Sequence, residues 1–400
     1  LHFVAFEHKQ RSKFWLRQNR TIPWTGVRKE WSFRMKQTPQ KVMLAMSGGV
    51  DSSASAILLL GEGCELLGAT LQLFPKDAGE REGACGAPSD IEDARRVAER
   101  LGFPHEVFPL LGRFREQVIN RFVSEYRAGN TPNPCIDCNR AIKFGALLEE
   151  AMARGFDAMA TGHYARVEQD AQTGRWLLKK ALDEKKDQTY VLYQLTQQQL
   201  AHVLFPLGNL RKEEVRAIAA QHGLINAQKP DSQDICFVPD GDYAAFIRRD
   251  TGLDFPQGRF IDADGNTLGT HQGMIHYTVG QRKGLGVAFG KPMYVLAKNA
   301  QENTVTLGPD EALFRREMLV ERVNFISIGA LSAPLRVRAK TRYRHAAQPA
   351  TLYPAEESCV KVIFDEPQRA ITPGQAAVFY ENDIVVGGGT ITAEPGYSRG

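Results

Sequence analysis

The stretch that decides the fold is Ser47-Gly48-Gly49-Val50-Asp51-Ser52-Ser53, which follows the short apolar run Lys41–Met46 and precedes the helix-like segment Ala54–Leu60. Glycines let a backbone approach a phosphate closely, and the N-terminus of the next helix offers free N–H groups and a positive dipole. The pattern predicts a buried strand, a phosphate-binding turn and a helix. Because the G-K-[ST] ending of a Walker A motif is absent, it argues against a γ-phosphate kinase or GTPase. The competing interpretation is a structural turn with N-capping serines.

Short apolar runs alternate with amphipathic segments downstream of this loop. The runs Leu66–Phe74 and Phe156–Ala160 predict buried strands, and Asp90–Leu101 and Phe114–Tyr126 predict helices. Strands that alternate with helices indicate an α/β fold with a doubly wound parallel sheet. We expect this domain to span residues 35–244.

The residue pattern of the sequence changes after Phe246, where glycines and turn-forming pairs become frequent and the apolar runs become short. This pattern predicts a small mixed α+β or β central domain over residues 245–315. From about Leu319 onward, alternating segments such as Cys359–Phe364 and Ala376–Tyr380 predict strands. We expect a C-terminal β-barrel over residues 316–395.

The basic charge of the chain belongs to its first residues. Residues 1–34 hold eight Lys or Arg against Glu7 and Glu30, so the overall charge of +4 leaves a net −2 for the remaining chain. This leader has no sustained hydrophobic period, and we interpret it as an unstructured tail or an extension of the gene model. An RNA-binding arm and an organellar transit peptide are the alternatives.

The location of the protein follows from two further features of composition. No run of eighteen apolar residues occurs, which excludes a membrane-spanning helix from the sequence pattern and predicts no membrane partner. Six cysteines in a long chain without a secretory signal favour a reducing compartment. We therefore expect a cytoplasmic protein, or one of an organellar matrix if the leader is a transit peptide.

Three of the six cysteines form a constellation. Cys135 and Cys138 form a C-x-x-C in the Pro-rich stretch Thr131–Asn139, ahead of a helix predicted over Ala141–Met152, and Cys236 follows 98 residues after Cys138. A helix N-terminus favours the reactive thiolate. The trio could hold a [4Fe–4S] cluster with one open iron, or two of the thiols could act as nucleophile and sulfur carrier. Inert buried thiols are the remaining interpretation, and we keep it for Cys64, Cys85 and Cys359.

The phosphate loop resembles the PP-loop of ATP pyrophosphatases, which cleave ATP between the α- and β-phosphates. From Met35 to about Glu394 the chain also resembles the tRNA-specific 2-thiouridylase family. The matching segments are MSGGVDSS, TPNPCIDCN with IKFGALLE, ATGHYARV, KKDQTYVLYQL, DSQDICFV, HYTVGQRKGLG, KTRYRH and TPGQAAVFY. The resemblance implies a PP-loop domain at residues 35–244 and a tRNA-contacting barrel.

The resemblance also implies roles for particular residues. Cys138 would be the nucleophile and Cys236 the cysteine that carries the persulfide. The ATP site would contain Ala45, Met46, Ser47, Gly48, Gly49, Val50, Asp51, Ser52, Leu71 and Gly162. The target base and tRNA would meet Asn133, Pro134, Cys135, His163, Lys186, Asp187, Gln188, Arg342, Tyr343 and Gln375. Many family members carry Asp where this chain has Cys135. This departure removes the carboxylate and opens the alternative of an iron–sulfur variant with Cys135, Cys138 and Cys236 as ligands, and the sequence does not decide between the two versions.

The implied reaction converts the wobble uridine of a tRNA anticodon loop to 2-thiouridine. ATP with Mg²⁺ would adenylate the C2 oxygen with release of pyrophosphate, and sulfur would then displace AMP. In a persulfide version Cys138 attacks the S–S bond and a Cys138–Cys236 disulfide forms. In a cluster version the open iron carries the sulfide. An upstream persulfide donor or relay protein would supply the sulfur.

A basic segment near the C-terminus offers local positive charge for RNA. Cations recur at every second position at Arg336, Arg338, Lys340, Arg342 and Arg344. In one continuous strand all five would lie on the same face. The competing interpretation is an edge strand protected by charge.

Two other functions stay open on the sequence alone. Another PP-loop ATP pyrophosphatase that acts on a small molecule would exchange pyrophosphate without RNA, but it leaves the basic segment and the cysteine trio unexplained. A non-catalytic RNA-binding or iron–sulfur protein would bind tRNA without releasing AMP.

Overall fold

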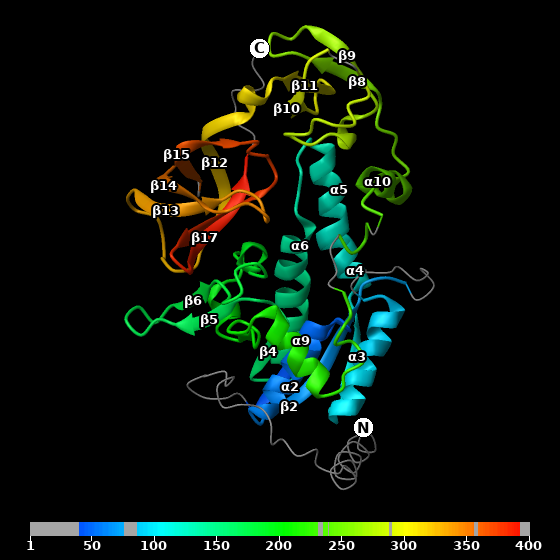
Figure 1. The fold of residues 1–400 in the computed structure, drawn as a ribbon, viewed down its shortest axis with the longest axis vertical. Coiled ribbons are helices and arrows are strands. Elements are labelled where there is room, and N and C mark those ends of the chain that lie inside the picture. The colour runs from blue at the N-terminus through cyan, green and yellow to red at the C-terminus, as the bar shows by residue number, and fades with distance from the viewer. Residues whose placement is uncertain are drawn as a thin grey trace.

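The structure is a computed structural model of the 400-residue chain. It describes residues 40–75, 86–230, 235–238, 240–287, 290–355 and 359–392, so the expectation for the leader falls outside the described residues. These residues form an α/β domain, a small central domain and a β-barrel (Figure 1). Within the described ranges, none of the helices has the length and hydropathy needed to cross a membrane.

The first domain is built on a five-stranded sheet in the order β3-β2-β1-β4-β7, in which every neighbouring pair is parallel. Its strands are β1 (Lys41–Ala45), β2 (Glu65–Gln72), β3 (His105–Pro109), β4 (Ala158–Thr161) and β7 (Val203–Leu204). The predicted doubly wound parallel sheet is therefore confirmed. Because β2 and β4 lie on opposite sides of β1, the chain reverses its direction of winding at β1, which is where ligands bind in such sheets.

Helices cover both faces of this sheet. The first face packs against α2 (Val50–Gly61), α3 (Pro88–Leu101) and α9 (Lys212–Gln221). The second face packs against α4 (Leu111–Phe114), π-helical Arg115–Ile119, α5 (Asn120–Arg127), α6 (Pro134–Asp137), π-helical Cys138–Leu147 and α7 (Leu148–Ala153). Alternation along β1 explains the two layers, since Val42 and Leu44 enter the first core and Met43 enters the second. Short helical turns at Thr189–Val191 and α8 (Gln197–Leu200) complete the domain.

The central domain consists of α10 (Tyr243–Thr251) and a four-stranded sheet in the order β10-β11-β8-β9. Its strands are β8 (Gly258–Ile261), β9 (Thr267–His271), β10 (Tyr294–Asn299) and β11 (Thr304–Gly308), with single 3₁₀ turns at Met274–His276 and Asp310–Leu313. Phe260, Val295 and Leu307 are fully buried in its small core. At the bottom of this domain in Figure 1, α5 of the first domain reaches up to it.

The C-terminal part is an antiparallel barrel, as predicted. Its strands are β12 (Phe314–Phe325), β13 (Leu335–Lys340), β14 (Gln348–Pro354), β15 (Val360–Arg369), β16 (Ala376–Glu381) and β17 (Ile384–Ile391). They follow the order β12-β15-β14-β13-β16-β17, and β12 also pairs with β17. This last pairing closes the sheet and leaves no free edge among the six strands.

A hairpin of the first domain extends the barrel's sheet. It consists of β5 (Arg166–Gln169) and β6 (Trp176–Lys179), and Lys179 of β6 pairs with Ile384 of β17. The hairpin was not predicted, because a strand that pairs with residues two hundred positions away shows no local sign of its partner. The barrel is thereby attached to the first domain through backbone hydrogen bonds.

Two expectations about local structure were wrong. The helix that follows the Pro-rich stretch begins at Pro134 rather than Ala141, because Pro at the first helical position and Asn133 at the N-cap start it earlier. The basic strand ends at Lys340, and the next residues form a turn. The five alternating cations therefore do not share one strand face.

Candidate functional site

The phosphate loop follows β1 at the carboxyl edge of the sheet. Gly48 has a φ of 67°, and a Cβ added there would collide with the carbonyl oxygen of Asp90, so the loop requires glycine at this position. Gly49 is the N-cap of α2, and the hydroxyls of Ser52 and Ser53 donate to its carbonyl oxygen at 3.1 and 3.0 Å. These bonds hold the loop against the N-terminus of α2, whose first N–H groups lack helical partners and favour an anion.

The residues predicted for ATP binding meet at this edge. Leu71 lies near the end of β2 and Gly162 directly follows β4, and both strands pair with β1. A Cβ on Gly162 would lie 2.8 Å from the Ser52 nitrogen and 2.9 Å from the Asp51 carbonyl carbon, so glycine permits this close packing. The structure thus gathers the whole predicted set around β1, namely Ala45, Met46, Ser47, Gly48, Gly49, Val50, Asp51, Ser52, Leu71 and Gly162.

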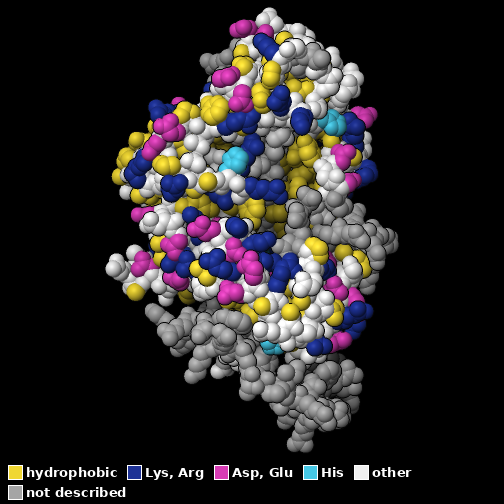
Figure 2. Space-filling view, viewed as in Figure 1, with side chains coloured by type: hydrophobic (Ala, Val, Ile, Leu, Met, Phe, Trp, Pro, Cys, Tyr) yellow, Lys and Arg dark blue, Asp and Glu magenta, His cyan; other side chains and the backbone are white. Residues whose placement is uncertain are grey.

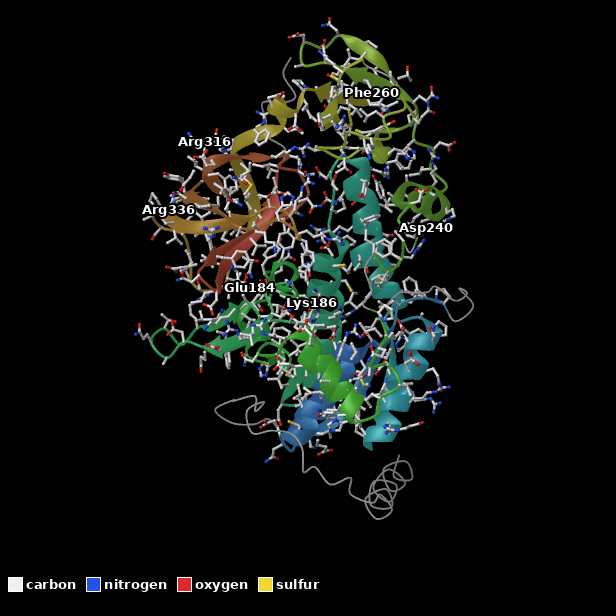
Figure 3. The ribbon with its side chains drawn as sticks, in the orientation of Figure 1. Glu184, Lys186, Asp240, Phe260, Arg316 and Arg336 are labelled. Carbon is white, nitrogen blue, oxygen red and sulfur yellow. The ribbon has the colours of Figure 1, made fainter. Side chains whose placement is uncertain are left out.

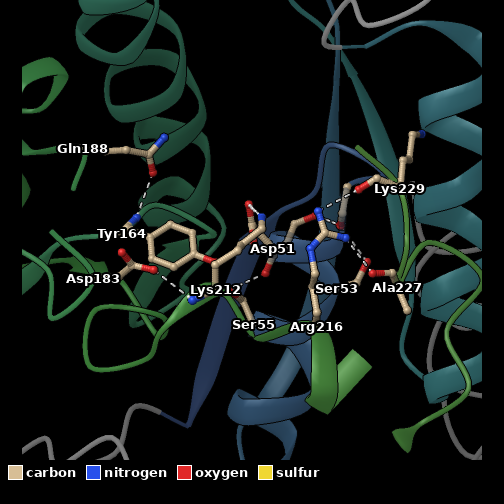
Figure 4. Close-up of polar contacts among 12 residues, drawn as sticks. Asp51, Ser53, Ser55, Tyr164, Asp183, Gln188, Lys212, Arg216, Ala227 and Lys229 are labelled. Carbon is tan, nitrogen blue, oxygen red and sulfur yellow. Dashed lines mark hydrogen bonds and ion pairs between the residues drawn. The ribbon is translucent and has the colours of Figure 1, made fainter. Parts of the chain in front are cut away.

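Two residues outside the predicted set bind the carboxylate of Asp51. Lys212 Nζ donates to its Oδ1 and Oδ2 at 2.7 and 2.9 Å, and the Tyr164 hydroxyl donates to Oδ1 at 2.9 Å (Figure 4). Lys212 is only 7% exposed and is the first residue of α9. A positive charge at a helix N-terminus is unfavourable because it opposes the helix dipole. The lysine at the start of α9 was therefore the sequence signal that could have pointed to Lys212. The pairing itself was missed because 161 residues separate the partners.

Cys135 and Cys138 lie in the first turns of a helical rod that runs from α6 to α7. The Asn133 side chain accepts a hydrogen bond from the Cys135 nitrogen at 3.1 Å, and Pro134 begins the helix. Cys135 is exposed and Cys138 is half-buried. This placement puts both thiols where the helix N-terminus favours the thiolate form.

Cys236 lies at the edge of the same hydrophobic cluster as Cys138. Both side chains are partly buried and pack against this cluster, which covers the second face of the sheet. The next residue, Phe237, is 2% exposed and stacks edge-on against Phe114 and Phe122, with ring centroids 5.9 and 5.1 Å away. Phe237 therefore anchors the Cys236 segment on the face of the sheet that carries the cysteine helix.

The iron–sulfur expectation for Cys135, Cys138 and Cys236 stays a prediction, because the structure does not show the cluster. Across the described ranges, which contain all three cysteines, no group of three or more Cys, His, Asp or Glu side chains comes together in a way that could hold a metal ion. Cys135 points to the exposed side of its helix, whereas the other two pack toward the core.

A loop of the barrel fastens the stretch that leads into the cysteine helix. Gln375 Nε2 donates to the Thr131 carbonyl oxygen at 2.7 Å, and the Thr131 nitrogen donates to the Pro373 carbonyl oxygen at 3.0 Å. A Cβ on Gly374 would lie 2.8 Å from the Cβ of Asn130. The predicted residue Gln375 therefore holds the barrel against the Asn133–Cys138 region.

Tyr343 stands where the barrel faces the cysteine helix. It is 39% exposed, and its ring centroid lies 5.9 Å from that of Tyr190 and 5.6 Å from Lys340 Nζ. Burial raises the pKa of Tyr343, and the nearby Asp187 carboxylate and Cys135 thiol raise it further. Tyr343, Asp187 and Cys135, three residues predicted to contact tRNA, are thus neighbours in the structure.

Two cations of the basic segment, Arg336 and Arg342, are bound by partners within the protein. Arg342 Nη2 donates to the carbonyl oxygens of Val279 and Ala370 at 3.1 and 2.9 Å, so it joins the barrel to the central domain. Arg336 forms two bonds of 2.7 and 2.8 Å with the Asp365 carboxylate, and Figure 3 shows it on the side of the barrel turned away from the cysteine helix. The predicted five-cation face is therefore absent.

The remaining predicted residues support the turn that follows β4. His163 is buried between the rings of Phe144 and Phe205, and burial lowers the pKa of its imidazole well below the usual value. Gln188 Oε1 accepts a hydrogen bond from the Tyr164 nitrogen at 2.8 Å, and Asp187 Oδ2 accepts one from the Thr189 hydroxyl at 2.7 Å. Lys186 lies at the meeting of this turn with the barrel (Figure 3).

A hollow separates the three domains on one side of the molecule. Figure 2 shows Lys and Arg side chains gathered around it and hydrophobic side chains within it. A pocket between the cysteine helix and the barrel is lined by Asn133, Ile136, Asp137, Tyr193 and Gly374, among others. The predicted base-binding residue Asn133 therefore opens into a pocket that both domains build.

Sequence comparison gives three consecutive family matches. The chain matches the tRNA methyl transferase HUP domain over residues 40–240, the tRNA methyl transferase PRC-barrel domain over residues 245–309 and the aminomethyltransferase beta-barrel domain over residues 315–391. These matches follow the order of the three structural domains.

Relatives of known assignment match along most of the chain. The chain is 52% identical to the tRNA-specific 2-thiouridylase MnmA of Acetivibrio thermocellus over 355 residues, which cover 88% of this chain and 99% of the relative. It is 54% identical to the tRNA-specific 2-thiouridylase MnmA of Heliobacterium modesticaldum over 360 residues, 89% of this chain and 93% of the relative. A solved 4-thiouridine synthetase–RNA complex with bound ATP is a distant match, with 19% identity and a TM-score of 0.30 over 50% of this chain and 46% of that one. The assignment to a family therefore rests on the sequence relatives.

Proposed function

The chain belongs to the tRNA-specific 2-thiouridylase family, and from this premise we propose that it uses ATP to convert a tRNA uridine to 2-thiouridine at the site described above. One observation carries the proposal: a phosphate loop at the sheet edge and two partly buried cysteines, Cys138 and Cys236, on the second face of the same sheet belong to one domain. This placement fits activation of a carbonyl oxygen by ATP followed by sulfur transfer. The proposed location is the cytoplasm, where thiols stay reduced.

The phosphate loop would hold ATP for the first step. The N-terminus of α2 would bind the phosphates, Leu71 would contact the adenine, and Gly162 keeps the facing turn close. The C2 oxygen of the uridine attacks the α-phosphate and pyrophosphate leaves. This oxygen, a poor leaving group by itself, can then depart as part of AMP. Mg²⁺, when bound, would neutralise phosphate charge, and Asp51 is the carboxylate of the loop that could hold it.

The two cysteines would carry out the second step. The terminal sulfur of a Cys236 persulfide attacks C2 and AMP leaves, which gives a Cys236–S–S–C2 adduct. The Cys138 thiolate then attacks the Cys236 sulfur, a Cys138–Cys236 disulfide forms, and the remaining sulfur leaves on C2 as 2-thiouridine. A persulfide donor protein loads Cys236, and a thiol reductant reopens the disulfide.

The barrel and the cysteine helix would hold the anticodon loop between them. A base that is modified must leave the stack, and unpaired loop bases are extruded most easily. Asn133 and Pro134, at the start of the cysteine helix, would meet the base, and Tyr343 offers an exposed ring for stacking beside Cys135. Arg342, Gln375 and His163 would act as positioning residues, because their side chains bind other parts of the protein.

Nucleoside analysis tests the proposal directly. The protein is incubated under anaerobic conditions with tRNA, ATP, Mg²⁺ and a persulfide donor, and the digested tRNA is examined by mass spectrometry. We expect 2-thiouridine at the wobble position, with one AMP and one pyrophosphate released per thiolated tRNA. Absence of 2-thiouridine, or pyrophosphate exchange that proceeds equally well without RNA, would instead support an enzyme of small molecules.

A further inference from the structure

The turn that follows α9 is docked on the phosphate loop. Asn226, in this turn, is 2% exposed, and its Nδ2 donates to the Gly48 carbonyl oxygen at 3.0 Å and to Ser53 Oγ at 2.8 Å. The Lys229 nitrogen donates to the Asn226 carbonyl oxygen at 3.0 Å and closes the turn. Arg216 of α9 donates to the Lys229 carbonyl oxygen at 3.3 Å (Figure 4). The backbone of Lys229 is therefore held at the phosphate loop.

The side chain of Lys229 reaches α3, which borders the same loop. Its Nζ donates to the carboxylates of Asp90 and Asp93 at 2.8 and 2.7 Å. Gly48 packs so closely against α3 that an added Cβ would collide with the Asp90 carbonyl oxygen. Asn226 and Asp90 thus contact the loop from two elements. Because Lys229 bonds to both, its ammonium lies beside the loop.

The Lys229 ammonium can donate to a further group. An ammonium has three N–H donors, and Asp90 and Asp93 take two of them within the described part of the chain. Burial lowers the pKa of Lys229, but its hydrogen bonds to these two carboxylates outweigh burial and the pKa is raised, so the charge is kept at neutral pH. The side chain is 32% exposed, which gives a ligand access to it. Lysine binds phosphate well because its ammonium is a compact point charge.

The sheet separates this cation from the two cysteines. Ala227 of the turn and the inner side of α3 belong to the core on the first face, whereas Cys138 and Cys236 pack against the cluster on the second face. The attacking and the leaving oxygen stand roughly in line on opposite sides of a reacting phosphorus. A uridine that reaches the cysteines approaches from the second face, so pyrophosphate departs toward the first face. Lys229 lies on that side.

We propose that Lys229 binds the β- and γ-phosphates of ATP and stabilises the charge of the departing pyrophosphate. The inference rests on the proposed function and assigns the leaving-group side of its nucleotide site. As the uridine C2 oxygen bonds to the α-phosphorus, the bond from that phosphorus to the β-phosphate oxygen breaks and its electron pair stays on pyrophosphate. The uridine N3 proton passes to water. The negative charge that collects on pyrophosphate faces the Lys229 ammonium.

A comparison of two nucleotides tests the assignment. The affinities of the full-length protein for α,β-methylene ATP with Mg²⁺ and for AMP are measured by calorimetric titration, with AMP as a competitor of the triphosphate. We expect Lys229→Met to lose at least about tenfold in affinity for α,β-methylene ATP, which corresponds to the lower end for a hydrogen bond to a charged group. Its affinity for AMP should change by less than about twofold, because AMP lacks the phosphates that Lys229 holds.

The matched control is Lys179→Met. Lys179 also bridges two carboxylates, those of Glu168 and Asp383, at 3.0 and 3.4 Å, but it lies on β6 in the hairpin that joins the barrel. This variant should bind both nucleotides as the wild type does. All variants are checked for folding by circular dichroism and thermal unfolding.

A second pair of variants separates phosphate binding from neutralisation of the carboxylates. The double variant Asp90→Asn, Asp93→Asn keeps the ammonium, and the triple variant adds Lys229→Met to it. Neither leaves a carboxylate unpaired at this position, so repulsion of phosphate and loss of folding are avoided. We expect the triple variant to bind α,β-methylene ATP at least about tenfold more weakly than the double variant.

The outcomes distinguish the two levels of the proposal. If the wild type binds neither nucleotide, the proposed nucleotide site is wrong. If the wild type binds the triphosphate, only the assignment of Lys229 is at stake. Equal affinities of the double and triple variants, or a loss in Lys229→Met that is the same for AMP as for α,β-methylene ATP, would overturn it.

Discussion

The ammonium of Lys212 and the carboxylate of Asp51 form a two-pronged ion pair, with Nζ 2.7 and 2.9 Å from the two carboxylate oxygens. The pair joins the first turns of α9 and α2, and Lys212 is buried while Asp51 lies on the phosphate loop. This ion pair satisfies a carboxylate that lies on the loop of the proposed phosphate site.

Replacement of Lys212 should therefore lower the stability of the protein. We expect Lys212→Met to lower the free energy of unfolding by about 3 kcal/mol, because the partly buried Asp51 carboxylate loses its cation and keeps only the Tyr164 hydroxyl as a side-chain donor. Part of this loss should return in the Asp51→Asn, Lys212→Met double variant, as measured by urea unfolding. Lys361→Met is the control, since the Lys361–Glu317 pair is about half exposed and should contribute less than about 1 kcal/mol. No excess loss in Lys212→Met over this control would contradict the expectation.

Substitution of Gly162 tests the location of the nucleotide site by adding a methyl group without changing any charge. Gly162→Ala places a methyl group 2.8 Å from the Ser52 nitrogen and must displace the first turn of α2. Overpacking of this kind costs about 1–3 kcal/mol, so we expect ATP affinity to fall by about tenfold in calorimetric titration. Gly112→Ala introduces a Cβ with no heavy atom within 4 Å and should bind ATP as the wild type does. Unchanged affinity in Gly162→Ala would place the nucleotide elsewhere.

The two cysteines should separate sulfur transfer from adenylation. We expect Cys138→Ser and Cys236→Ser to form no 2-thiouridine and yet to keep tRNA-dependent ATP–pyrophosphate exchange, because neither thiol takes part in the attack on the α-phosphate. Cys359→Ser, which changes a half-buried thiol of the barrel, should retain full activity. Thiolation by either Ser variant at the wild-type rate is the result that would reject the two-cysteine mechanism.

Tyr343 should contribute to tRNA binding without affecting ATP. Stacking of a base on an aromatic side chain is worth about 1–3 kcal/mol, so Tyr343→Ala should weaken tRNA binding by roughly 5- to 150-fold at fixed salt. Tyr353→Ala is the matched control, because Tyr353 is also a barrel tyrosine and is 37% exposed against 39% for Tyr343. Equal tRNA affinities of the two variants in filter binding would remove Tyr343 from the interface.

Lys298 should make stability depend on pH. Its ammonium is buried with no hydrogen-bond partner in the described part of the chain and lies 5.9 Å from the Tyr126 ring centroid. Burial lowers the pKa of Lys298 from 10.5 to about 8. Between these two values the unfolded chain binds more protons, so the stability contributed at this site rises with pH from about 8 to 10.5.

Lys298→Met should therefore stabilise the protein most at neutral pH. We expect a gain of up to about 3 kcal/mol in the free energy of unfolding at pH 7, which shrinks as the pH rises toward 10. The exposed Lys291 provides the control, because Lys291→Met should give a difference that stays flat with pH. A gain in Lys298→Met that grows with pH would contradict this account.

The sequence predicted the parts of the structure that depend on patterns within a few neighbouring residues. The strand–loop–helix unit around Ser47–Ser53 and the parallel sheet follow from apolar runs, glycines and helix periodicity within a few residues. Apolar positions of α3 such as Ala94 and Val97 are buried as their spacing indicated. The barrel was recognisable for the same reason, since alternation is a property of each strand.

What the sequence did not predict depends on contacts between distant segments. The Lys212–Asp51 pair, the Asn226–Gly48 bond and the pairing of β6 with β17 join residues more than 150 positions apart. The alternating cations of the basic segment gave a false signal, because Asp365 neutralises Arg336 and the strand ends before Arg342. Charge spacing predicts a shared face only as long as the strand continues.

The β5–β6 hairpin has a consequence for how the chain is made. Lys179 of β6 emerges from the ribosome 205 residues before its partner Ile384 of β17. At synthesis rates of about 5–20 residues per second, the edge of β6 waits roughly 10–40 s for the strand that will cover it. An unpaired strand edge can pair with another nascent chain during that interval. The last strand of the barrel thus sets the moment at which this edge of β6 is covered during translation.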